Sequence, residues 1–120
     1  MKAGNRQTGT RLRVVLEPDI AIGPGKADIL EGIRETGSIS AAARRMGMSY
    51  KRAWVMVDGL NRDFRDPLVE AAKGGARGGG ARLTALGEDV LARYRRIEAI
   101  AEKAAAKEVA ALKAALARSR

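Results

Sequence analysis

The spacing of apolar residues predicts a short strand followed by a first helix. Residues 12–17 (LRVVLE) are rich in β-branched and aliphatic side chains and end at Pro18, which is typical of an edge strand. From residue 25 to residue 36 the apolar positions follow a helical period. Pro24 lies near the start of this stretch and Gly37 directly after its end, where these residue types favour helix termini.

Two more helices are predicted after Gly37, separated by a tight turn. Ser38 offers a hydroxyl cap before the run AAARRM, and Gly47 interrupts that run after a few turns. Ser49 can cap again, and the helix that follows ends before Pro67. Its apolar residues keep a helical spacing: Ala53, Val57, Leu60 and Phe64.

The second half of the chain predicts a hairpin and a long last helix. Residues 68–72 and 81–84 are short enough to be strands, and the glycine-rich run KGGARGGG lies between them. Thr84 can cap a helix that runs without proline to Arg120. Its apolar residues form nearly one stripe, which we expect to pair with a second chain: Val90, Tyr94, Ile97, Ala101, Ala104, Val109 and Leu112.

This element order is that of a winged helix-turn-helix, so the predicted fold class is mainly α (α+β), with a two-stranded wing and a long C-terminal dimerisation helix. We expect three parts: a flexible basic arm at 1–11, the DNA-binding domain at 12–84 and the long helix at 85–120. A helix of this length exceeds one small domain, although its stripe could also pack back on its own domain.

Charge and composition favour a polyanionic partner. The chain carries 23 Lys and Arg against 14 Asp and Glu, a net charge of +9, which favours nucleic acid first and a membrane surface second. It contains neither Cys nor His, which removes disulfides, thiolate or imidazole metal ligands and histidine bases. We expect no cofactor, no metal and no membrane span, and a cytoplasmic protein.

The excess charge is concentrated between Ser38 and Arg82, where nine basic residues against four acidic ones give +5. A polar, basic start of the third helix suits the major groove, where Arg and Lys donate to guanine. The predicted base contacts are Tyr50, Lys51 and Arg52. The predicted backbone contacts are Ser38, Ser40, Arg44, Arg45 and Ser49. The predicted wing contacts are Lys73, Gly75, Arg77, Gly79 and Arg82.

A family resemblance follows from the motifs. The opening of the third helix combines Ser49, Tyr50, Lys51, Ala53 and Trp54, and it is followed by a glycine-rich wing and a Leu-Thr-x-x-Gly motif at Leu83, Thr84 and Gly87. Over roughly residues 25–100 this pattern resembles the N-terminal DNA-binding domain of ModE-type molybdate-responsive regulators, relatives of the LysR-type winged helices. The resemblance implies that Tyr50, Lys51, Arg52, Lys73 and Arg77 contact DNA and that the stripe from Val90 onward pairs two subunits.

The resemblance does not extend to a sensor. Full-length regulators of that type carry a C-terminal oxyanion-binding domain, whereas this sequence ends in a predicted helix, and nothing in it matches a molybdate pocket. We therefore expect a ModE-like DNA-binding part without the molybdate-binding domain, and molybdate as an effector is unsupported by this chain.

The leading hypothesis is a dimeric, sequence-specific transcriptional regulator, ModE-like and linked to molybdenum metabolism. The alternative is an architectural or adaptor protein that binds DNA and docks a separate effector subunit through the long helix. An enzyme is disfavoured, because Asp58, Asp63 and Asp66 form an acidic cluster without a phosphate loop or a metal-binding partner. For Trp54 we expect a structural role, packing the third helix onto its neighbours, rather than a DNA contact. Two simpler alternatives remain: Arg44 and Arg45 could be a solvated pair, and the glycine run could be only a spacer.

Overall fold

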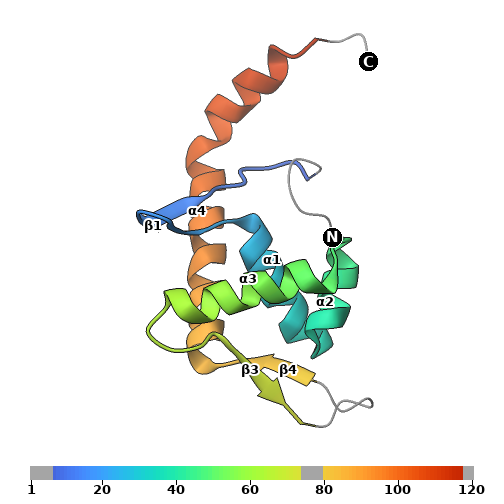
Figure 1. The fold of residues 1–120 in the computed structure, drawn as a ribbon. Coiled ribbons are helices and arrows are strands. Elements are labelled where there is room, and N and C mark those ends of the chain that lie inside the picture. The colour runs from blue at the N-terminus through green and yellow to red at the C-terminus, as the bar shows by residue number, and fades with distance from the viewer. Residues whose placement is uncertain (1–6, 74–79, 118–120) are drawn as a thin grey trace.

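The computed structural model describes residues 7–73 and 80–117, and in this part of the chain it contains four helices and two antiparallel two-stranded sheets. The predicted winged-helix fold class is confirmed. Three helices form the body, a hairpin lies on either side of them, and a long helix closes the domain and extends beyond it (Figure 1). The helices are α1 (Pro24–Thr36), α2 (Ile39–Met46), α3 (Tyr50–Asp63) and α4 (Ala85–Ala114). The strands are β1 (Val14–Glu17), β2 (Ile20–Ile22), β3 (Val69–Ala72) and β4 (Gly80–Leu83).

The predicted helix-turn-helix is formed by α2, a tight turn and α3. The Ser38 hydroxyl accepts a hydrogen bond from the Ala41 amide at 3.0 Å, and the Ser49 hydroxyl accepts one from the Arg52 amide at 3.1 Å. Both serines are therefore the predicted N-caps. Gly47 ends α2 in the left-handed region, with φ of 68°, a conformation that glycine adopts without steric penalty. The turn between α2 and α3 is thus as short as the sequence indicated.

Small residues allow α1 and α2 to pack closely. Ala42 is fully buried, and a Cβ placed on Gly32 of α1 would lie 2.9 Å from the Ala42 Cβ. We expected the small residues of α2 at its crossing with α3, but this pair shows that they also determine the crossing with α1. The core around them is aliphatic, apart from Tyr94, and its largest fully buried side chains are Ile29, Leu30, Ile33, Leu60, Leu68, Leu91 and Tyr94.

The predicted N-terminal edge strand is one half of a hairpin. β1 covers only the last four residues of the predicted strand and pairs with β2, which the apolar pattern did not predict. Asp19 makes the turn with φ of 67°, and the register shifts between Val15 and Glu17. β2 has three residues, too few to show an alternating pattern, so pairing rather than periodicity defines it.

The wing strands β3 and β4 lie near the predicted positions and pair from Val69 with Leu83 to Ala72 with Gly80. The Asn61 side chain holds the turn between α3 and β3, because its oxygen accepts the Leu68 and Val69 amides at 2.8 and 3.0 Å. The Ala81 amide donates to the Gly37 carbonyl at 2.9 Å, which ties β4 to the end of α1. The base of the wing is therefore attached to the helical body at both strands.

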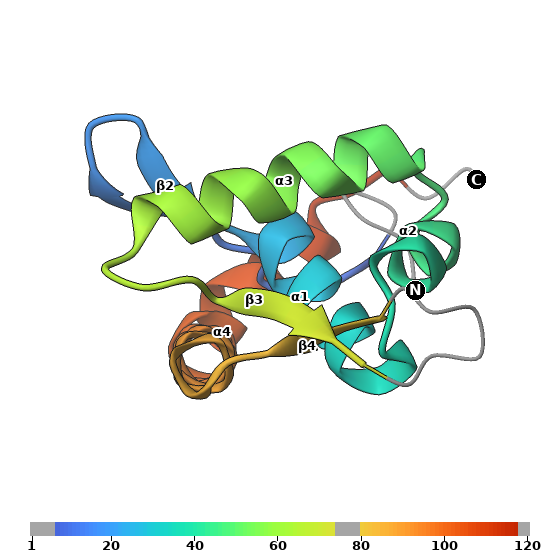
Figure 2. The same ribbon diagram turned by 60° about the horizontal axis from the view of Figure 1, so that its bottom comes forward.

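The long helix α4 starts where predicted and ends earlier. The Thr84 hydroxyl accepts the Gly87 amide at 3.0 Å, as expected for an N-cap. The helix ends at Ala114 rather than continuing to Arg120, and residues 118–120 lie outside the described part of the chain. Its C-terminal half extends beyond the rest of the molecule, which makes the protein elongated, with principal extents of 51 × 32 × 22 Å. The view along this helix in Figure 2 places it beside the wing and away from α2.

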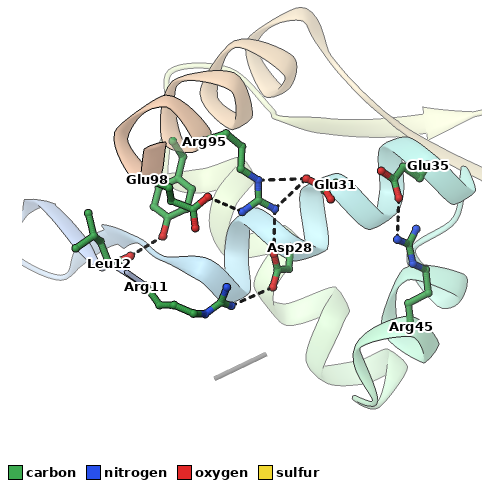
Figure 3. Close-up of polar contacts among 9 residues, drawn as sticks. Arg11, Leu12, Asp28, Glu31, Glu35, Arg45, Arg95 and Glu98 are labelled. Carbon is green, nitrogen blue, oxygen red and sulfur yellow. Dashed lines mark hydrogen bonds and ion pairs between the residues drawn. The ribbon is translucent and has the colours of Figure 1, made fainter. Parts of the chain in front are cut away.

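An ion-pair network joins α4 to α1 (Figure 3). Arg95 of α4 lies 2.9 Å from Asp28 and 3.0 Å from Glu31, both on α1, and 2.9 Å from Glu98. Arg11 pairs with the second oxygen of Asp28 at 3.5 Å. Burial of the Arg95 guanidinium disfavours its charge, but the hydrogen bonds that it donates to Glu98 and Asp28 outweigh that effect and raise the pKa of Arg95. The network therefore adds charged contacts between α4 and α1 to the apolar packing of α4 on the core.

The N-terminal segment also contacts α4. Of the predicted arm, residues 7–11 are described, and the Thr10 amide donates to the Glu102 carboxylate at 2.7 Å. This hydrogen bond lowers the pKa of Glu102. The Tyr94 hydroxyl donates to the Leu12 carbonyl, and burial raises the pKa of Tyr94. Residues 7–12 thus lie along α4 beside the ion-pair network.

Asp28→Asn is expected to lower the free energy of unfolding by about 2 kcal/mol. The substitution removes the buried carboxylate that pairs with the guanidinium groups of Arg95 and Arg11. Asp28 is only 2% exposed, so water cannot replace the lost charge. The control is Asp89→Asn, which breaks the exposed pair between Asp89 and Arg93. That change is expected to alter stability by about 0.5 kcal/mol or less. Denaturant unfolding measures both, and equal losses would contradict a structural role for the network.

Candidate nucleic-acid interface

The exposed side of α3 carries the three predicted base contacts. Ala53, Val57 and Leu60 are buried and face the core, so the positions between them face outward. Tyr50, Lys51 and Arg52 are all exposed in the first turn of the helix. The first turn projects them beyond the protein surface, with the helix amides and two free cations at the same end. This arrangement can donate hydrogen bonds to an acceptor-rich groove.

The predicted backbone contacts lie around the helix-turn-helix. Ser40, Arg44, Arg45 and Ser49 are exposed, and Ser38 is half-buried. The serine oxygens of Ser38 and Ser49 are used as caps, but each hydroxyl proton remains available to a phosphate oxygen. Arg44 donates to the Ser40 hydroxyl at 3.2 Å.

Two of the predicted phosphate-binding cations are paired with acidic residues within the protein. Arg45 lies 2.7 Å from Glu35 of α1 (Figure 3), and Arg82 lies 2.9 Å from Glu70 across the wing. Both pairs are substantially exposed, so each contributes little to stability and can exchange its carboxylate for a phosphate. Arg44, Lys51 and Arg52 have no carboxylate within salt-bridge distance among the described residues.

The predicted wing contacts are only partly described. Lys73 is exposed directly after β3, and Arg82 is exposed on β4. Gly75, Arg77 and Gly79 lie outside the described residues. The described bases of β3 and β4 place the wing on the same side of the molecule as α2 and the start of α3 (Figure 2).

Two exposed apolar side chains of α3 change the predicted interface. Trp54 was expected to pack inside the fold, but it is 49% exposed and lines a shallow hollow between α3 and the wing with Ile39 and Glu70. Val55 is 55% exposed and was not among the predicted contacts. Helical spacing from Lys51 would have placed Val55 on the outer face, but an apolar residue in a helix is more often read as core.

The predicted dimerisation stripe divides into a buried and an exposed part. Tyr94 is 1% exposed in the core of its own domain, so it has no surface to offer a second chain, which corrects its predicted place in the stripe. Val90 packs partly on the same core. Ile97 and Leu112 are 38% and 69% exposed, and Ile100, which was not predicted, is 68% exposed. The other members are small or half-exposed: Ala101, Ala104 and Val109.

The described residues show neither a cluster of His, Cys, Asp and Glu suited to a metal ion nor a helix long and apolar enough to cross a membrane.

A family comparison identifies the helix-turn-helix. The model of bacterial regulatory helix-turn-helix proteins of the lysR family matches residues 26–88, from α1 to the first turn of α4. The chain belongs to this family. The LysR-type winged helix expected from the sequence is therefore confirmed. The three predicted base contacts, Tyr50, Lys51 and Arg52, lie within the matched segment.

Several relatives support the ModE resemblance. The chain is 48% identical over 100 residues to the molybdenum-pterin-binding protein MopB of Rhodobacter capsulatus, which covers 82% of this chain and 37% of MopB. It is 38% identical to the molybdenum transport protein ModE of Azotobacter vinelandii, over 76% of this chain and 35% of that protein. It is 37% identical to the DNA-binding transcriptional dual regulator ModE of Escherichia coli K12, over 78% of this chain and 36% of that protein. The chain thus spans about a third of the length of these relatives.

Solved structures of LysR-type proteins share the fold. The crystal structure of a CbnR_DBD–DNA complex superposes with a TM-score of 0.58 at 27% identity, covering 73% of this chain and 95% of that one. CbnR itself, a LysR family transcriptional regulator, gives a TM-score of 0.56 at 27% identity, over 72% of this chain and 28% of that one.

Proposed function

We propose that this protein is a sequence-specific DNA-binding transcriptional regulator that inserts the start of α3 into the major groove. The observation that carries the proposal is the exposed first turn of α3, where Lys51 and Arg52 have no acidic partner among the described residues. Unpaired cations at the start of a capped helix suit guanine O6 and N7 and the adjacent phosphates. The solved complex of a LysR-type DNA-binding domain supports the same class of partner.

The proposed contacts divide into base reading and backbone positioning. Tyr50, Lys51 and Arg52 read bases, because they project from the helix end that enters the groove. The hydroxyls and cations of the helix-turn-helix and wing hold the backbone: Ser38, Ser40, Arg44, Arg45, Ser49, Lys73 and Arg82. Gly75, Arg77 and Gly79 complete the proposed wing contacts. Because Arg45 and Arg82 exchange Glu35 and Glu70 for phosphate, they contribute less to binding than Arg44.

We further propose that two chains pair through α4, with residues 12–84 as the DNA-binding domain and residues 85–120, which include α4, as the dimerisation segment. Exposed isoleucine and leucine side chains on a helix that extends beyond its domain gain burial when a second copy covers them. Such a homodimer presents two recognition helices to duplex DNA, about 34 Å apart. Half-sites with a two-fold relation follow from the symmetry of the dimer.

The names of the relatives support a link between the proposed regulation and molybdenum metabolism. MopB and the ModE proteins are named for molybdenum-pterin binding, molybdenum transport and transcriptional regulation. Since the chain matches only about a third of each, the proposal transfers their DNA-binding part and not a sensor. We propose a regulator and not an enzyme, because the matched family is one of bacterial regulatory helix-turn-helix proteins.

Arg52→Ala is expected to weaken binding to the preferred duplex about tenfold to a hundredfold and binding to random duplex much less, because a bidentate guanine contact contributes about 1–3 kcal/mol of discrimination. The control is Arg93→Ala on α4, which removes an equal charge from a side chain paired with Asp89, away from α3. Fluorescence anisotropy at fixed salt measures both duplexes for each variant. Equal losses on both duplexes would show that Arg52 contacts only phosphate, and no preferred duplex for the parent protein would reject the proposed function.

A further inference from the structure

The outward face of α3 contains an exposed apolar side chain beside two cations of the first turn. Val55 follows Lys51 by four residues and therefore lies next to it, one turn further along the helix. Arg52 precedes it by three residues, and Asp58, which lies 3.5 Å from Arg62, follows it by three. Among these charged neighbours Val55 is 55% exposed. The proposed DNA-reading face thus has an apolar residue one helical turn after Lys51 and Arg52.

The fold does not explain the valine. Ala53 and Val57, two residues before and after it, are buried, so Val55 points away from the core. A β-branched residue is also a weaker helix former than the long-chain residues usually found on such faces. Replacing Val55 with a polar residue would therefore be neutral for folding. Its apolar surface is available to a partner that approaches the outer face of α3.

The chemistry of the major groove supplies an apolar group that matches it. Thymine is the one base that presents a methyl group there, beside the acceptors and donors that Lys and Arg read. Lys51 and Val55 are separated along the helix by about 6 Å, which is less than two base-pair steps of about 3.4 Å. When Lys51 and Arg52 donate to bases, Val55 therefore faces a base pair of the same half-site.

We propose that Val55 determines specificity by packing on the C5-methyl group of a thymine in each half-site. This inference rests on the proposed function, because it requires α3 to enter the major groove. Lys51 and Arg52 donate to bases of the half-site, and the valine adds a preference for thymine at one further position. Cytosine or uracil at that position leaves the valine surface without its apolar contact.

The test uses the full chain and the duplex that it enriches from a random pool. Each thymine of one half-site is replaced in turn by deoxyuridine, while the other half-site is kept unchanged; the replacement removes the methyl group and keeps the base-pairing and acceptor groups. At one position the replacement is expected to weaken binding about fourfold, the effect of one buried methyl group per contact. In Val55→Ser the ratio of affinities for the thymine and uracil duplexes is expected to fall to about one, because serine offers no methyl group.

The matched control is Val15→Ser, a valine of β1 that is 58% exposed. The N-terminal hairpin lies beside the C-terminal end of α3, away from its first turn (Figure 2). Val15→Ser is expected to keep the fourfold preference for thymine. Serine and valine have similar helix propensities, so the melting temperature of Val55→Ser should equal that of the parent chain. If every replacement is silent, if Val55→Ser keeps the preference, or if the half-site contains no thymine, the role of Val55 is overturned while the DNA-binding function stands. A random pool that yields no enriched duplex overturns both.

Discussion

Gly87→Ala is expected to lower the free energy of unfolding by about 3 kcal/mol, at the upper end of the usual effect of overpacking. A Cβ at Gly87 would lie 2.1 Å from the Leu68 carbonyl oxygen and 3.0 Å from its carbon. That carbonyl accepts the Thr84 amide at 2.9 Å, so neither group can move without breaking the junction between the wing and α4. The glycine of the Leu-Thr-x-x-Gly motif is therefore needed for a close backbone approach. Denaturant unfolding monitored by circular dichroism measures the loss.

The matched control is Gly59→Ala in α3. The nearest atom to a Cβ there is an Arg62 guanidinium nitrogen at 3.8 Å, so the methyl group meets no backbone. This change is expected to raise stability by up to about 1 kcal/mol, the difference in helix propensity between glycine and alanine. Similar stabilities of the two alanine variants would contradict the close packing of α4 against β3.

Ala104→Glu is expected to convert the dimer to monomers and to weaken binding to a two-half-site duplex about a hundredfold. Because a two-fold interface contains each residue twice, one substitution brings two carboxylates to the apolar stripe of α4. Loss of pairing removes the effective concentration with which the second domain binds after the first. Sedimentation velocity measures the assembly, and anisotropy on duplexes with one or two half-sites measures the coupling.

Ala106→Glu is the control for this experiment. It lies two residues after Ala104 and therefore on the opposite side of α4, and both alanines are exposed in the single chain. It makes the same change of charge on the side of α4 away from the stripe. We therefore expect the dimer and the affinity gained from a second half-site to stay unchanged. A monomeric parent chain, or equal effects of the two variants, would reject pairing through this stripe.

Helices were predicted well because their signals are local. Ser38, Ser49 and Thr84 each cap the helix that follows them, and Gly37 and Gly47 each end one in the left-handed region. These residues act through atoms within four positions of themselves, so the sequence alone displays them. The same is true of Lys51 and Arg52, which are exposed because of their place in a capped, periodic helix.

The features that the sequence did not predict depend on partners far along the chain. β2 is a strand because β1 pairs with it, and Tyr94 is core rather than dimer surface because it reaches Leu12. Asn61 gives no signal of its own, since only the fold brings the Leu68 and Val69 amides to it. Arg95 likewise looks like a solvated cation until α1 supplies Asp28 and Glu31. Long-range contacts of this kind leave no period and no motif in the sequence.

Exposure was the least predictable property of the interface. Trp54 and Val55 are apolar residues in a helix with a buried face, and such residues are usually core. Their exposure depends on where the wing and α1 cover α3, which helical spacing alone does not show. The two residues add apolar surface to a proposed interface that was expected to be cationic: Trp54 lines the hollow between α3 and the wing, and Val55 lies on the outer face of α3.

Selection of bound duplexes from a random pool tests the central claim most directly. The dimer with two recognition helices predicts enrichment of one inverted repeat, with half-site centres about 10 base pairs apart. The parent chain should enrich this repeat at physiological salt, and Arg52→Ala should enrich it poorly or relax one position of each half-site. A pool that stays random after repeated rounds, while the chain still binds duplex DNA tightly, would contradict sequence reading by α3.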